Sequence, residues 1–385
     1  MSKNRKIRCL QVLTRSDWAG AQKVVYNLIY GIKEKYSDII EVEVACGKEN
    51  GLLINELKRL GVVVHIVPDL VREISPIKDL KAFFELLKII KEGKYDVVHL
   101  HMSKVRVLGG LAAKLSGVKG IYATVHGWWH IEQYSGLKRS FLILAERFAA
   151  IFFDKIVLLC HRDLLKAKKW KIGKDSQYVI IPNALIPQPP APKGKLRKEL
   201  GIPENVKIVG NVARLDRPKN PVRFLQVAER VVQEMDDVIF VWIGGSIVED
   251  FYAKQVQQYL DERPWLKEKV KILGFRKDAI ELMADFDVFL LTSDEEGFGL
   301  VILEAMSLGK IVVSTRCGGP EDIIEDKING FLTGFDYKEI ATKINFILEN
   351  FESIKQKIGQ AAVERAKDFK IDNQVEGYVR LYKKG

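Results

Sequence analysis

The chain has 385 residues, which is long for a single hydrophobic core, so we expect two domains or slightly more. Apolar residues make up 47% of the chain and charged residues 29%, a composition typical of an ordinary soluble α/β protein. The longest apolar run, 141–160, is interrupted by four charged residues and therefore does not predict a membrane span. The basic residues 1–8 are followed by too short an apolar stretch for a signal peptide.

The net charge of +11 is concentrated in the first half of the chain. Residues 1–190 contain 31 Lys and Arg against 18 Asp and Glu, whereas residues 191–385 contain 30 against 32. The densest basic cluster, 162–174, lies close to an aromatic-rich run at 141–153. No base-stacking or groove-reading motif accompanies it, so we expect no nucleic acid partner. Two interpretations remain open, a surface attracted to an anionic membrane and a solvated cationic helix face.

The four cysteines do not form a metal-binding or redox motif. They are widely spaced and include no CxxC pair, and three of them lie in or beside apolar strands. The cysteines are Cys9, Cys46, Cys160 and Cys317. We therefore expect buried free thiols in a reducing cytoplasm.

The first half alternates short apolar strands with amphipathic helices, the pattern of a buried parallel sheet. Strands are expected at 7–13, 41–46, 62–68, 95–101, 121–125, 156–160 and 178–181. Helices are expected over 24–32, 51–60, 77–91 and 104–116. The proline-dense stretch 186–194 then predicts a semi-rigid linker, which places the domain division near residue 190.

The second half repeats the same alternation and so predicts a second parallel sheet. Strands are expected at 207–214, 238–245, 270–275, 288–291 and 311–315. Helices are expected from residue 222 and at 278–284, 300–308, 322–325, 337–350, 353–369 and 372–384.

The stretch 290–309, LLTSDEEGFGLVILEAMSLG, is the most informative of the chain. An apolar strand leads through an acidic, glycine-rich turn into an apolar helix that ends at Gly309. Such a turn forms an anion cradle, because free backbone amides and the helix dipole point toward it. Glu296 and Glu304 flank the cradle with seven residues between them. The alternative is two solvated glutamates near a helix start, where carboxylates are stable in any case.

The sequence EGFGLVILE resembles the E-x7-E signature of the family 4 retaining glycosyltransferases, which have the GT-B fold. The resemblance implies an α/β protein with two Rossmann-like parallel-sheet domains facing a central cleft. It also implies that Glu296 grips the hydroxyls of the donor sugar and that Glu304 grips the nucleotide ribose. Helical spacing puts the two at most about 12 Å apart, too far for the roughly 5 Å of a retaining glycosidase pair. The intervening Gly297, Phe298, Gly299 and Leu300 are predicted to bind the donor.

Further motifs of the first half resemble this family in the same order. Residues 14–22 resemble its glycine-rich diphosphate loop, with Gly20 at the position of close approach and Ala19 in place of the first glycine. The strand end ATVHG resembles the one whose histidine contacts donor and acceptor, which assigns that role to His126. Nearby Trp128 and Trp129 are suited either to stacking on a sugar or lipid or to a partly buried aromatic loop. Asn183 lies in a turn similar to the family's IPNG.

In the second half, Arg214 and Lys219 at a strand end resemble the family's Arg and Lys pair, which implies that they clamp the diphosphate of the donor. The departing diphosphate accumulates negative charge, which a forked guanidinium and a compact ammonium stabilise. Here Lys219 is followed by Asn220, where the family often has glycine.

Two further groups complete the expected site, and a third is set aside. The motif with Gly318 and Gly319 resembles the family's GGxxE turn, which implies backbone contact with sugar or phosphate. Phe275 and Arg276 follow a strand whose loop runs along the nucleotide base in the family. Asp285 and Asp287 spell D-x-D, a metal signature of a different glycosyltransferase fold. We interpret it as incidental here and expect no metal and no further cofactor.

The resulting hypothesis is a retaining glycosyltransferase that uses a UDP- or GDP-sugar and a glycan or lipid-linked acceptor. Residues 1–190 would bind the acceptor, residues 191–371 the nucleotide sugar, and a final helix at about 372–385 would pack back on the first domain. A cytoplasmic or peripheral inner-membrane location and a role in surface polysaccharide or glycolipid synthesis are expected. A GT-B sugar phosphorylase and a non-catalytic sugar-nucleotide or membrane-binding scaffold are the alternatives. A dinucleotide dehydrogenase is disfavoured because no GxGxxG follows the first strand.

Overall fold

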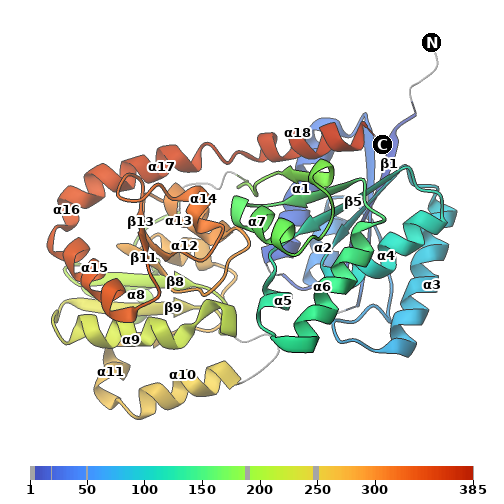
Figure 1. Cartoon of the computed structure of the whole chain (residues 1–385). Coiled ribbons are helices and arrows are strands. Elements are labelled where there is room, and N and C mark those ends of the chain that lie inside the picture. The colour runs from blue at the N-terminus through green and yellow to red at the C-terminus, as the bar shows by residue number, and fades with distance from the viewer. Residues whose placement is uncertain (1–4, 19, 49–50, 187–190, 246–250, 385) are drawn as a thin grey trace. The chain divides into compact units, whose positions relative to one another are not determined.

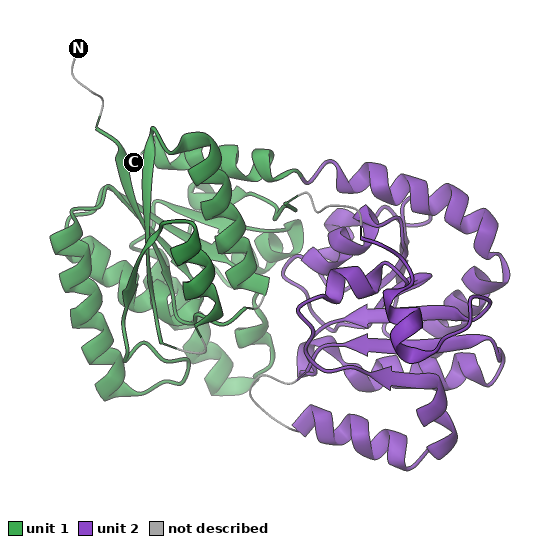
Figure 2. Cartoon of the chain, turned by 180° about the vertical axis from the view of Figure 1, so that it is seen from behind, with its two compact units in different colours: residues 1–186, 370–385 green, residues 187–369 purple. Residues whose placement is uncertain are grey.

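A computed structural model describes residues 5–18, 20–48, 51–186, 191–245 and 251–384. The chain divides into two compact units, which Figure 2 shows in separate colours. Unit 1 comprises residues up to 186 together with 370–385, and unit 2 comprises residues 187–369. The end of the chain therefore belongs to the same unit as its beginning.

Unit 1 is built on a seven-stranded sheet in the order β3-β2-β1-β4-β5-β6-β7, and each adjacent pair of strands is parallel. The strands are β1 (Ile7–Leu13), β2 (Ile40–Cys46), β3 (Val63–Ile66), β4 (Val97–His101), β5 (Gly120–Val125), β6 (Lys155–Leu158) and β7 (Tyr178–Ile180). The central strands β1, β4 and β5 are largely buried and mostly apolar because helices cover both faces of the sheet, and a few buried polar side chains lie among the apolar ones.

The helices of unit 1 form two layers with separate hydrophobic cores. One core is shared by α1 (Gly20–Tyr36), α2 (Leu52–Arg59) and α18 (Ile371–Tyr382). The other is shared by α3 (Pro76–Gly93), α4 (Ser103–Leu115), α5 (Trp129–Glu132), α6 (Gly136–Ala150) and α7 (His161–Lys169). Figure 1 shows α3, α4 and α6 side by side in the second layer.

Unit 2 repeats this plan with six parallel strands in the order β10-β9-β8-β11-β12-β13. The strands are β8 (Lys207–Val212), β9 (Val238–Ile243), β10 (Val270–Ile272), β11 (Val288–Leu291), β12 (Ile311–Thr315) and β13 (Phe331–Thr333). Both sheets reverse their order beside the first strand, at β1/β4 and at β8/β11. Doubly wound sheets bind ligands outside the carboxyl ends of the strands at such reversals, so these two places are where sites are expected.

The helices of unit 2 also lie on both faces of its sheet. Those that share one apolar core include α9 (Pro221–Val232), α10 (Phe251–Asp261), α11 (Pro264–Lys269) and α15 (Tyr337–Glu349). The remaining helices are α8 (Lys195–Leu200), α12 (Ala279–Met283), α13 (Leu300–Ser307), α14 (Pro320–Ile323), α16 (Phe351–Ile354) and α17 (Gln360–Ala366), with a π-helix at Lys355–Gly359 and a short 3-10 turn at Arg217–Lys219. Another short 3-10 turn, Asp175–Gln177, belongs to unit 1. α13 packs against α17 and α12.

Most of the strands and helices that the sequence predicts are present, but the structure also contains elements that the sequence did not predict, including α5, α6, α7, α8, α10, α11 and β13. The predicted helix over 353–369 is divided into α16, the π-helix and α17. The aromatic-rich run at 141–153, to which the sequence assigned no element, forms most of α6. The run is apolar on nearly all sides, so its helical period is obscured. In the part of the chain that the structure describes, no helix is long and apolar enough to cross a bilayer.

A buried network of polar side chains ties α18 to the sheet of unit 1. The Tyr382 hydroxyl lies 2.5 Å from Nδ1 of His99 and accepts a hydrogen bond from Nε2 of Gln11 at 3.0 Å. Nε2 of His99 lies 2.7 Å from Oγ1 of Thr124, whose oxygen is 3.2 Å from the Tyr378 hydroxyl. Two tyrosines of the last helix thus satisfy polar groups of three central strands.

The same network continues to the carboxyl ends of β4 and β5. Nε2 of His101 lies 2.8 Å from Oε1 of Gln11, and its Nδ1 lies 3.1 Å from Nε2 of His126. Burial lowers the pKa of His99 to about 3 and that of His101 well below its usual value. Both rings are therefore neutral at physiological pH, each with one donor and one acceptor nitrogen.

These neutral histidines predict that unit 1 loses stability in mild acid. The unfolded chain binds protons at His99 below about pH 6.5, and the folded chain does not, so the free energy of unfolding falls as the pH falls. Each such histidine contributes up to about 1.4 kcal/mol per pH unit. We expect His99→Gln to reduce the slope of stability between pH 6 and 5 by about 1 kcal/mol per pH unit, measured by urea unfolding. His161→Gln, at an exposed position, is the control and should keep the wild-type slope.

Candidate functional site

The loops that follow β8, β11 and β12 meet beside the order reversal of the unit 2 sheet. The amide of Asp294 donates to the carbonyl of Pro218 at 2.7 Å, which joins the first two loops. The amide of Glu296 donates to the carbonyl of Cys317 at 2.8 Å, which joins the second and third. Because the carboxyl ends of parallel strands share one edge, motifs far apart in sequence come together here.

Lys219 and Glu296 form the central contact of this site. The Lys219 ammonium lies 2.6 Å from Oε1 of Glu296, which also accepts a hydrogen bond from the Ser293 hydroxyl at 2.8 Å. The Lys219 side chain is 18% exposed and that of Glu296 is 9% exposed, so the pair is largely withdrawn from solvent. Arg214 lies on the same loop as Lys219, half-exposed and 2.8 Å from Asp216. Lys219 of the predicted diphosphate clamp therefore contacts the first predicted glutamate, whereas Arg214 is bound to Asp216 on the same loop.

The two glycines at 318 and 319 hold the backbone of Glu296. Glu296 and Gly318 form an isolated parallel bridge, and the Gly319 amide donates to the Glu296 carbonyl at 3.0 Å. A Cβ at Gly319 would lie 2.2 Å from the Phe298 Cα, and Gly318 has a φ of +117°. Glycine is required at both positions for this approach of two loops. The motif therefore has a structural role, and its predicted contact with a ligand stays a prediction.

Asn220, Arg223 and Asp294 form a polar cluster beside the Lys219 loop, here called the supporting cluster, which the sequence analysis did not identify. The Arg223 guanidinium donates to the Asp294 carboxylate at 2.7 Å and to the Thr292 carbonyl at 2.8 Å. The side-chain Nδ2 of Asn220 donates to the same carboxylate at 3.2 Å. The side-chain Oδ1 of Asn220 accepts a hydrogen bond from the backbone amide of Arg223 at 3.1 Å. Asn220 has a φ of +47°, in the left-handed region that favours glycine and tolerates asparagine. The departure from Lys-Gly thus keeps the backbone conformation and adds side-chain contacts.

The remaining residues of the acidic loop have different environments. Gly299 has a φ of +92° and precedes α13, whose first residue is Leu300. The Phe298 side chain is buried against Phe369, with ring centroids 5.7 Å apart, so only its backbone is available to a ligand. Gly297 and Glu304 are partly buried.

Phe275 and Arg276 follow β10, at the edge of the sheet. Phe275 is 58% exposed. The Arg276 guanidinium is bound to Asp278 at 2.9 Å and to Glu199 at 3.0 Å, and these hydrogen bonds raise its pKa. Of the two, the free aromatic face of Phe275 is the better suited to a base, since Arg276 is already held by two carboxylates.

In unit 1 the predicted residues lie at the carboxyl ends of central strands. Gly20 begins α1 and is exposed, and a Cβ built on it would meet no atom within 4 Å. Packing within the protein therefore does not require glycine at this position. Trp128, for which stacking on a ligand was one interpretation, is fully buried, and its Nε1 donates to the Asp163 carbonyl at 3.1 Å. Stacking by Trp128 is thus excluded.

His126 follows β5 and is half-buried beside His101. Burial and the charge of Arg106 lower its pKa to about 3. Oε1 of Gln11 can only accept, so Nε2 of His101 carries the proton and donates to it. Because His101 is neutral, its Nδ1 is an acceptor and receives a hydrogen bond from Nε2–H of His126. Nδ1 of His126 is then an acceptor. Because the ring binds a proton weakly, it is suited to orient a hydroxyl rather than to deprotonate it.

Asp285 and Asp287 bind backbone amides. Asp285 accepts from the amide of Leu196 at 2.7 Å, at the start of α8, and Asp287 accepts from that of Ile208 at 2.9 Å. These carboxylates therefore serve to anchor neighbouring segments. Among the described residues, no group of three or more His, Cys, Asp or Glu side chains is arranged to hold a metal ion.

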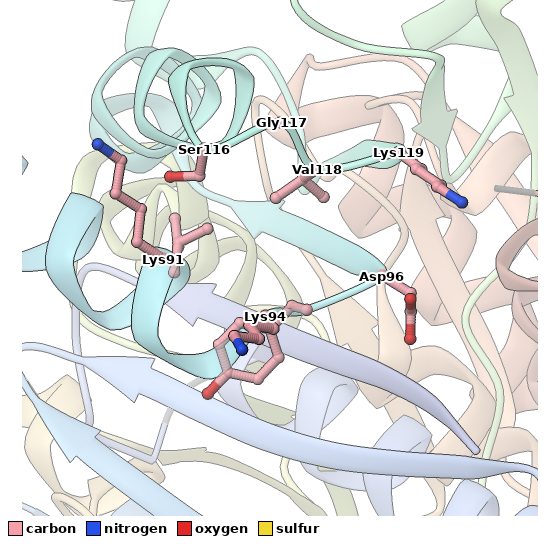
Figure 3. Close-up of a pocket in the computed structure, with 9 residues that line it drawn as sticks. Lys91, Lys94, Asp96, Ser116, Gly117, Val118 and Lys119 are labelled. Atoms are coloured by element: carbon pink, nitrogen blue, oxygen red, sulfur yellow. The ribbon is translucent and has the colours of Figure 1, made fainter. Parts of the chain in front are cut away.

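A pocket of about 260 Å³ lies elsewhere, at the amino ends of β4 and β5 (Figure 3). Its lining includes Lys91, Lys94, Asp96, Ser116 and Lys119. None of the predicted residues lines it, and it opens at the edge of the sheet opposite to His101. It is therefore not part of the candidate site.

Comparisons with known proteins identify the family of the chain. The family model described as Glycosyl transferases group 1 matches residues 192–365, and that described as Glycosyltransferase Family 4 matches residues 18–187. The chain is 31% identical to a UDP-Gal:alpha-D-GlcNAc-diphosphoundecaprenol alpha-1,3-galactosyltransferase of Escherichia coli, over 90% of this chain and 88% of that one. It is 27% identical to an N,N'-diacetylbacillosaminyl-diphospho-undecaprenol alpha-1,3-N-acetylgalactosaminyltransferase of Campylobacter jejuni, over 85% and 87%.

Among solved structures, Anabaena HepE in complex with UDP and glucose superimposes with a TM-score of 0.85 at 23% identity, over 98% of this chain and 100% of that one. This likeness shows that the fold is GT-B. The chain belongs to the family 4, group 1 glycosyltransferases and is a glycosyltransferase.

The left-handed backbone at Asn220 leads to a test of the supporting cluster. Asn220→Gly keeps the conformation and loses only the side-chain contacts, so we expect a change of a few tenths of a kcal/mol in the free energy of unfolding. Asn220→Ala also places a Cβ in the left-handed region and should lose about 2 kcal/mol. Urea unfolding measures both. Equal losses in the two variants would contradict the assigned conformation.

Proposed function

We propose that this chain is a retaining glycosyltransferase that transfers a sugar from a UDP-sugar to a lipid-linked glycan during surface polysaccharide synthesis. The donor is supported by the E. coli relative, which is named for UDP-Gal, while a GDP-sugar stays the alternative. The acceptor is supported by two relatives named for diphosphoundecaprenol-linked sugars. The pathway is supported by a third relative, a Staphylococcus aureus protein named for capsular polysaccharide biosynthesis and 24% identical over 97% of this chain.

The ion pair of Lys219 and Glu296 is the observation that carries this proposal. It places a cation and a carboxylate at 2.6 Å in a largely buried loop cluster, with Arg214 on the same loop. Lys219 and Arg214 would stabilise the charge on the departing diphosphate, and Glu296 would accept hydrogen bonds from donor hydroxyls. When the donor binds, its hydroxyl and phosphate groups can replace the contact between Lys219 and Glu296.

Retention of configuration would follow from attack on the same face as departure. The bond between the anomeric carbon and the diphosphate oxygen breaks, and the acceptor hydroxyl oxygen bonds to that carbon. The hydroxyl proton passes to the departing diphosphate oxygen. His126 would accept a hydrogen bond from a substrate hydroxyl, consistent with its low pKa. This scheme requires no protein nucleophile.

Other residues would bind the rest of the donor. Glu304 would bind the ribose, and Phe275 would contact the base. Gly20 would allow close approach of a phosphate in unit 1, where substitution meets open space. The N-terminal domain, residues 1–190, would then bind the acceptor and residues 191–371 the donor. A lipid-linked acceptor would also bring the enzyme to the inner face of the membrane.

Removal of the Lys219 ammonium tests the assignment. We expect Lys219→Ala to lower kcat by about 10²-fold or more, as loss of one transition-state donor does, with UDP-galactose and a polyprenyl-diphosphate-linked N-acetylglucosamine. Lys338→Ala changes an exposed lysine of α15 and should keep wild-type kinetics. The anomeric configuration of the product is determined by NMR in the same reactions.

Three results would contradict the proposal. Unchanged kinetics in Lys219→Ala would remove the ion pair from the reaction. A β-linked product from an α-linked donor would exclude retention. Release of sugar 1-phosphate on addition of inorganic phosphate would identify a phosphorylase instead.

Metal independence is a separate prediction. Two cations and the amide-rich start of α13 would supply the positive charge that a divalent ion supplies elsewhere. We expect the rate of UDP release to change by less than about twofold when excess EDTA is added to the assay. A large loss that Mg²⁺ or Mn²⁺ restores would show that a metal takes part.

A further inference from the structure

The outer face of α6 carries a continuous stripe of exposed apolar side chains. These residues, here called the α6 stripe, are Leu137 (91% exposed), Phe141 (62%), Leu144 (63%), Phe148 (47%) and, directly after the last residue of the helix, Ile151 (74%). Their spacing of four, three, four and three residues places them on one side of the helix. The opposite side packs into the core of unit 1 through Ala149 and Ala150. The helix is therefore apolar on both its inner and its outer face.

A surface helix of a soluble protein ordinarily has charged and polar side chains on its outer face. Scattered apolar residues need no explanation, but five in one row form a patch of the kind that marks an interaction site. Burial in the fold does not explain their presence, since all five remain exposed in the structure. The stripe therefore calls for a partner outside the described chain.

The charged groups near the stripe select the kind of partner. On α6 the basic residues are Lys138, Arg139 and Arg147. Its one carboxylate, Glu146, is buried and bound to Arg106 at 2.5 Å, so no acid on this helix faces solvent. The neighbouring α7 adds basic residues, with Leu165 exposed among them. Phenylalanine, leucine and isoleucine beside lysine and arginine are the composition of helices that lie in the interface of an anionic bilayer.

A second stripe on α3 extends the same layer. Ile77 (72% exposed), Leu80 (58%) and Phe84 (57%) follow one another at three and four residues. Lys78, Lys81 and Lys88 are exposed on the same helix. Both α3 and α6 pack against α4 on one face of the sheet, as Figure 1 shows, so their outer sides belong to one layer of unit 1.

We propose that this layer is the membrane-docking surface of the protein, with the α6 stripe entering the headgroup and upper acyl region of an anionic bilayer. The inference deepens the proposed function and rests on it for the source of the acceptor, since a lipid-linked acceptor lies in such a bilayer. Exposed lysines and arginines then contact anionic headgroups, while the apolar side chains leave water. The lipid surface is the one occupant that uses both features of the layer.

Binding to vesicles tests the surface without any enzymatic assay. Wild-type protein is floated with vesicles of phosphatidylethanolamine and phosphatidylglycerol, and with vesicles of phosphatidylcholine alone. We expect binding to the anionic vesicles that weakens as salt is raised, and much weaker binding to phosphatidylcholine. Phe141→Glu and Leu144→Glu should each lower the partition coefficient by about tenfold or more, and together by about a hundredfold.

A matched control separates the stripe from exposed apolar residues in general. Phe346 is 48% exposed on α15 of unit 2, outside the proposed layer, and Phe346→Glu should bind vesicles like the wild type. All these positions are on the surface, so the variants should keep the wild-type melting temperature. Wild-type protein that does not float with anionic vesicles, or stripe variants that float equally well, would overturn the inference. A wild-type dimer that Leu144→Glu converts to a monomer, without vesicle binding, would assign the stripe to a second copy instead.

A transfer assay links the surface to the acceptor. With the acceptor embedded in anionic vesicles, Phe141→Glu and Leu144→Glu should slow transfer about tenfold, and detergent-solubilised acceptor should restore the wild-type rate. Equal slowing in both settings would overturn the docking role. Protein that binds vesicles through the stripe and transfers no sugar would refute the proposed function and leave this inference standing.

Discussion

The contact between Lys219 and Glu296 is the interaction on which the loops of the candidate site in unit 2 depend. The two residues come from loops after β8 and β11, strands that lie side by side although about 80 residues separate them in the chain. The pair is largely buried, and a buried charge is stable only when it is neutralised and hydrogen-bonded. The Ser293 hydroxyl donates to the Glu296 carboxylate, and the Cys317 carbonyl and the Gly319 amide bind the backbone of Glu296. The loop after β12, which contains Cys317 and Gly319, thereby helps to hold the loop after β11 beside the loop after β8.

The supporting cluster of Asn220, Arg223 and Asp294 shows how local backbone and site geometry depend on each other. Asn220 accepts a left-handed conformation that most residues avoid, and its side chain contacts both Arg223 and Asp294. These contacts join the turn before α9 to the acidic loop, so the position of Lys219 depends on both. A glycine at position 220 would adopt the same backbone conformation but would lack the side-chain contacts with Arg223 and Asp294.

In unit 1 the last helix of the chain, α18, packs against the sheet formed by the first half of the chain. α18 contributes Tyr378 and Tyr382 to the core beside α1, and their hydroxyls satisfy buried groups of β1, β4 and β5. The neutral state of the histidines is a consequence of this burial. His126, at the edge of the network, takes its low basicity from the same surroundings and from Arg106. Its suitability as a hydrogen-bond acceptor is therefore a property of the whole strand end.

The sequence by itself determined the parallel α/β architecture, the positions of most strands and helices, and the motifs that identify the family. Apolar periodicity, apolar runs and glycine turns depend only on residues that are neighbours in the sequence, so they can be recognised without knowing the fold. Tertiary structure decided the rest. Only packing shows that Trp128 is buried, that Arg276 is held by Glu199, and that Asp294 is joined to Asn220. Likewise, the outer face of α6 became evident only once its inner face had been placed against the core, because exposure depends on contacts between segments distant in sequence.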